Sequence, residues 1–118
     1  MFNKSFESTE DIFKNCINLK ELDFNNFTTN ETNNMAGMFY GCFSLKSLNL
    51  TNFDTKKVIN MSYLFMNVKH EIILDNFDTS NVIDMKYMFA DCVTLSSLNL
   101  INFNTKKVKE IKYIVVSI

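Results

Sequence analysis

Several residue types that specify particular folds or partners are missing or scarce in this chain of 118 residues. It contains no proline, tryptophan or arginine, only two glycines, three cysteines and one histidine. The lack of arginine removes the side chain best suited to bidentate recognition of phosphate. Because the 12 lysines are balanced by 13 acidic residues, the net charge is −1 and nucleic acid is not expected as a partner.

Long apolar runs are absent as well. No window approaches the roughly 18 consecutive apolar residues of a membrane span, and the opening residues MFNKSFESTEDIF lack the apolar segment of a signal peptide. We therefore expect a soluble chain without a membrane span. Hydrophobic residues still make up 47% of the sequence, which is enough for the packed core of one domain.

The dominant feature of the sequence is an internal repeat. The stretch Met35–Phe53 returns along the chain, and its most regular positions form a column of Met35, Met61, Met85 and Ile111 and a column of Phe39, Phe65, Phe89 and Val115. We divide the single repeat domain 1–118 into a weak half repeat or cap at 1–11, repeats at 12–37, 38–63, 64–87 and 88–113, and a truncated unit at 114–118. One such unit is too small to bury its own apolar side chains, so the units are expected to stack.

Two hydrophobic periods occur inside each unit. Leu48-Asn49-Leu50 alternates apolar and polar residues, which is typical of a short half-buried strand, and Leu98-Asn99-Leu100 does the same. Apolar residues at i, i+3, i+6 and i+7, counted from Val58 and again from Val82, fit one face of a helix. A threonine such as Thr55 precedes each run and could cap a first helical turn.

These patterns predict an α/β repeat solenoid of leucine-rich-repeat-like type, with a short parallel β-sheet on one face and short helices on the other. A triangular β-solenoid is the alternative, because a spacing of three residues also runs from Val58 to Leu64 and from Cys42 to Leu48.

The recurring string also resembles known repeat families. Its core, Leu45-x-x-Leu48-x-Leu50-x-Asn52-Phe53, resembles a leucine-rich repeat. The fuller string, which adds Met38-Phe39 and Cys42 before this core and Asp54-Thr55, Val58 and Met61 after it, looks like the surface-protein repeat of BspA-like and mycoplasma-type lipoproteins. This resemblance implies an extracellular or cell-surface repeat region with a role in adhesion and with no known catalysis. A cytoplasmic chain or a fragment of a longer protein is the alternative.

Residues with reactive side chains fall in positions that favour packing. Cys16, Cys42 and Cys92 share a column with Val68, which indicates buried thiols that act as small hydrophobes. A disulfide between Cys16 and Cys42, or a metal or catalytic role, is the alternative. His70 is expected on a surface loop. We therefore predict no catalytic, cofactor-binding or metal-binding residues, no cofactor and no enzymatic activity.

Two polar columns are expected to form hydrogen-bonded ladders that satisfy backbone groups of the turns. These columns are Asn26, Asn52, Asn76 and Asn102, and Thr29, Thr55, Thr79 and Thr105.

The outward positions of the predicted strands form the candidate binding face. They are Asp23, Asn49, Ile73 and Asn99, with Thr51, Asp75 and Ile101 beyond them. The expected function is that of a non-enzymatic repeat region of a surface-type protein that mediates interaction or adhesion through a protein or glycan ligand. A structural spacer, or a fragment of a longer array without a binding role of its own, is the alternative. Edge-to-edge self-association through the C-terminal coil is also expected, because its apolar tail ends inside a repeat.

The assignment of inward and outward positions can be tested by introducing the same residue at two neighbouring sites. Leu48→Asp is expected to abolish folding because it buries an unpaired carboxylate, whereas Asn49→Asp should leave stability almost unchanged. Thermal and urea unfolding followed by circular dichroism measures both. Equal effects of the two substitutions on stability would show that the assignment of faces is wrong.

Overall fold

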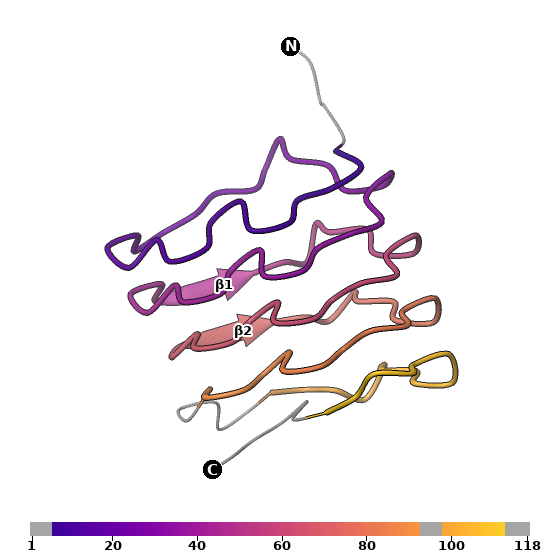
Figure 1. Ribbon diagram of the computed structural model, residues 1–118. Helices are drawn as coiled ribbons and strands as arrows, with labels where there is room; N and C mark the ends of the chain where they lie inside the picture. Colours follow the sequence, from indigo (N-terminus) through magenta and orange to yellow (C-terminus); the bar gives the residue numbers. More distant parts are fainter. Residues whose placement is uncertain (1–5, 93–97, 113–118) are drawn as a thin grey trace.

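The computed structural model describes residues 6–92 and 98–112, over which the chain winds in successive coils stacked on one another (Figure 1). Isolated parallel bridges join equivalent residues of neighbouring coils, namely Ser8, Asn34, Asn60, Asp84 and Glu110. We number the coils from these bridges as coil 1 (8–33), coil 2 (34–59), coil 3 (60–83) and coil 4 (84–109), with the start of a further coil at Glu110. The molecule is a slab with extents of 42 × 35 × 22 Å.

Regular secondary structure is limited to two short strands in the described part of the chain. Strand β1 (Ser47–Asn49) pairs in parallel with β2 (Glu71–Ile73), and Leu48 lies opposite Ile72 in this register. Leu48 is buried between exposed neighbours, as its alternation predicted. The second predicted strand segment, 98–100, is described but is not a strand.

The predicted helices are wrong. No helix occurs among residues 6–92 and 98–112, so the α/β architecture with helices on one face is not the fold. The predicted capping role of Thr55 and its equivalents is therefore wrong too. The truncated unit at 114–118, with the apolar tail invoked for self-association, lies outside the described residues.

In place of a helix, each coil contains a run of overlapping turns. In coil 2 the N–H groups of Met38, Tyr40 and Cys42 each bond the carbonyl three residues back. The alternate N–H groups, including those of Met35 and Phe39, instead donate to carbonyls of coil 3 at 2.8 to 3.1 Å. This segment therefore satisfies its backbone partly within the coil and partly across the stack, which an α-helix cannot do because all its bonds are internal.

The turns explain why the apolar spacing imitated a helix. They place residues three and four apart on the inner side, so that Met35, Met38 and Phe39 are all fully buried. The turns also require positive φ at two positions per coil, which Gly37 (φ 63°) and Gly41 (φ 77°) supply in coil 2. The equivalents of Gly41 in the other coils are residues that tolerate the left-handed region, namely Asn15, Asn67 and Asp91.

A column of phenylalanine rings forms the centre of the core. Phe13, Phe39, Phe65 and Phe89 stack along the coils with ring centroids 5.9, 5.9 and 5.5 Å apart and interplanar angles of 12°, 5° and 18°. Stacked aromatic pairs contribute about 0.5 to 1.5 kcal/mol beyond the burial of their surface. Stacking in this column is therefore most favourable when the spacing between coils is constant.

The predicted threonine ladder is confirmed for three of its members. The buried hydroxyl of Thr55 donates to the carbonyl of Asp78 at 2.9 Å and accepts the N–H of the same residue at 2.8 Å. Thr29 forms the same pair of bonds with Asp54, and Thr79 forms it with Asn104. Each threonine thus closes a gap in the ladder where two coils are joined by a side chain instead of by backbone.

The asparagine ladder is confirmed at two positions. Asn76 donates to the carbonyl of Thr51 at 2.8 Å, and Asn102 donates to the carbonyl of Asp75 at 3.1 Å. Both bonds reach back to the turn of the preceding coil, so this column also joins successive coils.

The threonine ladder yields a matched pair of variants. Thr55→Val should destabilise the fold by about 1 to 3 kcal/mol, because it leaves the N–H and C=O of Asp78 without their buried partner. Thr105→Val should change stability by less than about 0.5 kcal/mol, because Thr105 is exposed and its hydroxyl has no hydrogen-bond partner among the described residues. Urea unfolding of both variants measures the difference, and equal losses would argue against the ladder as a source of stability.

Candidate functional site

The predicted binding face is built from side chains that are largely engaged in their own turns. Asp23, Asn49 and Asn99 are exposed, but a carboxylate or amide oxygen of each accepts the backbone N–H two residues later at 2.9 to 3.0 Å. Such bonds stabilise the turn and occupy one acceptor of each side chain. These polar atoms of the face therefore stabilise the turns of the protein itself.

The other members of the predicted face differ from one another in polarity and in exposure. Ile73 is half-buried opposite Asn49 in the sheet, Asp75 is exposed, and Ile101 is 83% exposed. A hollow of about 410 Å³ brings together Asp23, Asn49 and Thr51. It is lined in addition by Leu22, Phe24, Asn25 and Asn52. Ile73, Asp75, Asn99 and Ile101 do not line this hollow.

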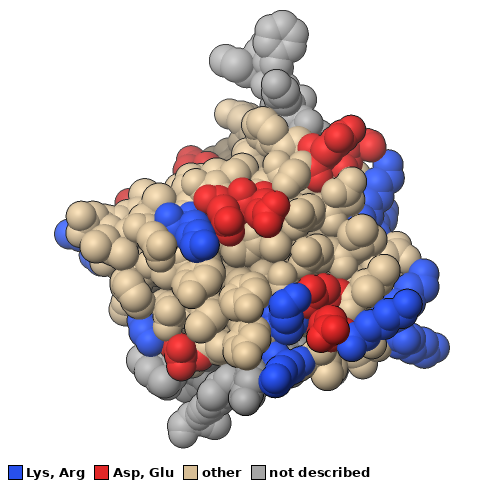
Figure 2. All heavy atoms as spheres, in the orientation of Figure 1, with Lys and Arg blue, Asp and Glu red and all other residues tan. Residues whose placement is uncertain are grey.

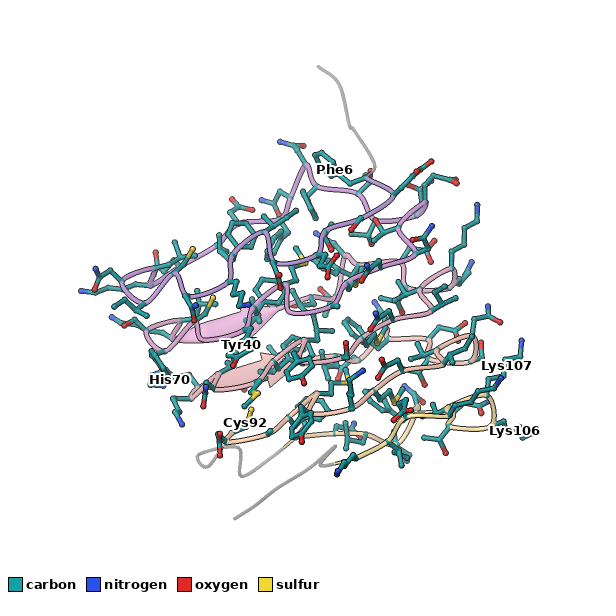
Figure 3. The ribbon with its side chains drawn as sticks, in the orientation of Figure 1. Phe6, Tyr40, His70, Cys92, Lys106 and Lys107 are labelled. Atoms are coloured by element: carbon teal, nitrogen blue, oxygen red, sulfur yellow. The ribbon has the colours of Figure 1, made fainter. Side chains whose placement is uncertain are left out.

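A second hollow was not anticipated from the sequence. It has a volume of about 260 Å³ and receives side chains from coils 1 to 4. We call it the tyrosine groove, and its lining residues are Glu10, Asp11, Lys14, Ala36, Gly37, Tyr40, Asn60, Ser62, Tyr63, Asp84 and Lys86. Tyr40, which is labelled in Figure 3, lies in the middle of the stack.

Three half-buried tyrosines form the apolar part of this region. The rings of Tyr40 and Tyr63 stack at 5.8 Å with an interplanar angle of 4°, and those of Tyr63 and Tyr87 stack at 5.1 Å and 15°. The ammonium group of Lys14 lies 5.2 Å from the ring centre of Tyr40 on the coil 1 side. The ring faces are therefore turned along the stack, as in the phenylalanine column.

The backbone of this region is unusual. Tyr63 (φ 59°) and Tyr87 (φ 58°) adopt the left-handed conformation that Gly37 adopts at the equivalent position of coil 2. For a residue with a Cβ this conformation costs roughly 1 to 2 kcal/mol. Stacking of the two ring pairs offsets a cost of this size. The glycine contributes in another way, since a Cβ at Gly37 would lie 2.2 Å from the Asp11 carboxylate, which occupies that space.

Polar groups surround the tyrosines at coil spacing. An amide or carboxylate oxygen of Asn34, Asn60 and Asp84 accepts the N–H two residues later, at 2.9 to 3.0 Å. Lys86 also forms an ion pair of 2.6 Å with Asp84, and this hydrogen bond raises the pKa of the lysine. The groove thus combines ring edges, hydroxyls, one amide and carboxylates, and its acidic and basic side chains largely balance each other in charge.

The remaining reactive residues lie elsewhere. His70 is exposed at one end of the coils, and the exposed pair Lys106 and Lys107 lies at the other end (Figure 3). Acidic and basic side chains are interspersed on the face shown in Figure 2, with lysines along one edge. Among residues 6–92 and 98–112, no group of three or more His, Cys, Asp or Glu residues is placed to hold a metal ion.

The thiols are placed in or next to the core, as predicted. Cys42 and Cys92 are buried, Cys16 is half-buried, and all three are free, so the alternative disulfide between Cys16 and Cys42 does not form here. The thiols of Cys42 and Cys92 donate to the carbonyls of Phe13 and Phe65 in the coils before them, at 3.1 and 3.0 Å. Burial raises the pKa of each to about 11. A thiol of this kind is a poor nucleophile at neutral pH.

The architecture identifies a repeat protein built from parallel, turn-rich coils. Its sequence places it more closely: the chain belongs to the family described as Mycoplasma protein of unknown function, DUF285, which matches residues 44–117. This membership agrees with the predicted resemblance to mycoplasma-type repeats at the level of the family. Searches of curated proteins and of solved structures gave no significant match. Within the described residues, no helix is long and apolar enough to cross a membrane.

The buried thiols predict a pH dependence of stability. The pKa of about 11 in the folded protein lies above the ordinary value of 9.0, so the folded state holds these protons more tightly than the unfolded state. The resulting stability is complete below about pH 9 and is lost as the pH rises to about 11. A double variant Cys42→Val, Cys92→Val should lose less stability over this range, by on the order of 2 kcal/mol per thiol.

The double variant should fold, because Val68 occupies the same column in coil 3 and is fully buried. Urea unfolding at pH 8 and pH 11 of both proteins measures the difference. An identical pH dependence in the two proteins would contradict a contribution from these thiols.

Proposed function

We propose that this chain is a non-enzymatic interaction region of a surface-type protein of the BspA-like kind, and that it binds a linear glycan in the tyrosine groove. A cell-surface location is part of the proposal and is supported by the membership in a Mycoplasma protein family. The observation that carries the proposal is the combination, in one hollow, of stacked tyrosines with hydroxyl, amide and carboxylate groups.

The chemistry of the groove suits sugars. Sugar hydroxyls both donate and accept hydrogen bonds, and the groove offers the carboxylate of Asp11 and the amide NH2 group of Asn60. The edges of the Tyr40 and Tyr63 rings add the apolar and hydroxyl-bearing surface that binding sites commonly use. Because the charges of Asp84 and Lys86 largely compensate each other, a neutral ligand is favoured over a strongly charged one.

The repetition of the groove favours a polymer over a single sugar. Parallel coils repeat at about 4.8 Å, and a sugar unit in an extended glycan advances by a similar distance. Within the groove, Asn60 of coil 3 and Asp84 of coil 4 are equivalent residues, and they present polar groups at coil spacing to successive units of a glycan that lies along the stack.

The experiment is a glycan array probed with the full chain, followed by calorimetric titration with soluble oligosaccharides of increasing length from the best class. Affinity should rise until the oligosaccharide spans the coils that line the groove, and it should then level off. Tyr63→Gly should weaken binding by at least about tenfold, equivalent to about 1.4 kcal/mol. The variant should still fold, because glycine suits the positive φ of this position and Gly37 occupies it in coil 2.

Two control variants separate the possible sites. Ile101→Ser changes the most exposed large hydrophobic residue of the predicted strand face and should leave glycan binding unchanged. Tyr63→Phe retains the stacked ring and removes only the hydroxyl, so it should have an effect between those of the other two. Loss of binding in Ile101→Ser alone would move the site to the strand face. The absence of glycan binding would contradict the proposal and would favour a protein ligand or a structural spacer instead.

A further inference from the structure

The edge of coil 1 resembles the interfaces inside the stack, but no coil of the described residues packs against it. Ile12 is 44% exposed, whereas its equivalents Met38 and Leu64 in the next two coils are fully buried. Phe13 and Cys16 are half-buried, whereas Phe39 and Cys42 have no exposed surface. The apolar side chains of coil 1 thus lack, among the described residues, the preceding coil that covers their equivalents in coils 2 and 3.

The backbone of the same edge has unused hydrogen-bonding groups. At each bridge inside the stack, the carbonyl of the bridge residue accepts from the coil before it, as Asn34 accepts from Thr9 at 2.9 Å. The equivalent carbonyl of Ser8 accepts no hydrogen bond from any described residue, and the N–H of Glu7 donates none. The carbonyls that follow in the same row and also lack a described donor are those of Glu10, Ile12 and Lys14.

The opposite edge offers the complementary groups. Ile111 is 49% exposed, whereas Met61 and Met85 in the same column are fully buried and donate their N–H groups to the next coil. The N–H of Ile111 has no acceptor within the described part of the chain, and the carbonyl of Lys109 has no donor there. The free N–H of Ile111 thus corresponds in position to the free carbonyl of Ser8, and the free carbonyl of Lys109 corresponds to the free N–H of Glu7, all within the described part of the chain.

We infer that two copies of this chain dock head to tail through these edges. In this contact the Ile111 N–H of one copy donates to the Ser8 carbonyl of the other, and the Glu7 N–H donates to the Lys109 carbonyl. This pattern continues the parallel bridges that already join Ser8, Asn34, Asn60, Asp84 and Glu110 within one molecule. The contact also covers Ile12 and Ile111. Because the two surfaces differ, the contact does not close on itself and can extend into longer stacks.

The first experiment is sedimentation velocity over a concentration series with wild type and two lysine variants. The wild type is expected to associate as its concentration rises, and Ile12→Lys should abolish this association because it places a charge in the proposed contact. Ile59→Lys is the matched control, because Ile59 is 46% exposed on an inner coil, away from both edges. It should associate like the wild type. Circular dichroism confirms that both variants fold.

A mixing experiment then tests the direction of docking. Ile111→Lys should also be monomeric, since it blocks the other edge. A mixture of Ile12→Lys and Ile111→Lys retains one intact edge of each kind and should form a one-to-one dimer that does not elongate. A wild type that stays monomeric at every concentration, or association that Ile12→Lys and Ile59→Lys reduce equally, overturns the inference. A mixture that remains monomeric while the wild type associates overturns the head-to-tail arrangement.

Discussion

The structure depends on the sharing of backbone hydrogen bonds between neighbouring coils. In the turn segment of coil 2, alternate N–H groups bond carbonyls of coil 3, and the intervening ones bond within the segment. A coil in isolation would leave the first set without partners, at a cost comparable to a lost hydrogen bond for each buried group. The coils are therefore stable only as a stack, and each one must repeat the geometry of its neighbours.

Many polar side chains serve this requirement. Thr29, Thr55 and Thr79 bond the next coil with buried hydroxyls, and Asn76 and Asn102 bond the coil before them. Polar side chains at recurring positions also accept N–H groups of their own turns, as the exposed Asn49 and the half-buried Asp54 and Asn60 do. A polar residue on the surface of this protein is thus more often part of the fold than part of a site.

The tyrosine groove is lined by residues whose types change from coil to coil. Tyr40 and Tyr63 do not occupy equivalent positions, and their rings stack between coils 2 and 3. Tyr63 and Tyr87 stand at a position where each of coils 1 to 4 has positive φ, and this left-handed conformation is costly for a large side chain. Departures of this kind from a repeat are where a function is most readily accommodated, because the fold itself does not require them.

The sequence alone determined the repeat, the buried columns and the threonine ladder. These properties follow from periodicity, since residues such as Leu48, Met61 and Phe65 recur at one position and are buried there. The choice between helices and overlapping turns was decided only by the tertiary structure. Both arrangements bury residues three and four apart, and the difference lies in whether alternate N–H groups can reach a neighbouring coil. A column of Asn15, Gly41, Asn67 and Asp91, all tolerant of positive φ, was the local signal for turns. The tyrosine groove left no comparable signal, because the stacked pair that lines it, Tyr40 and Tyr63, joins residues from different columns, and only the packed coils bring those columns together.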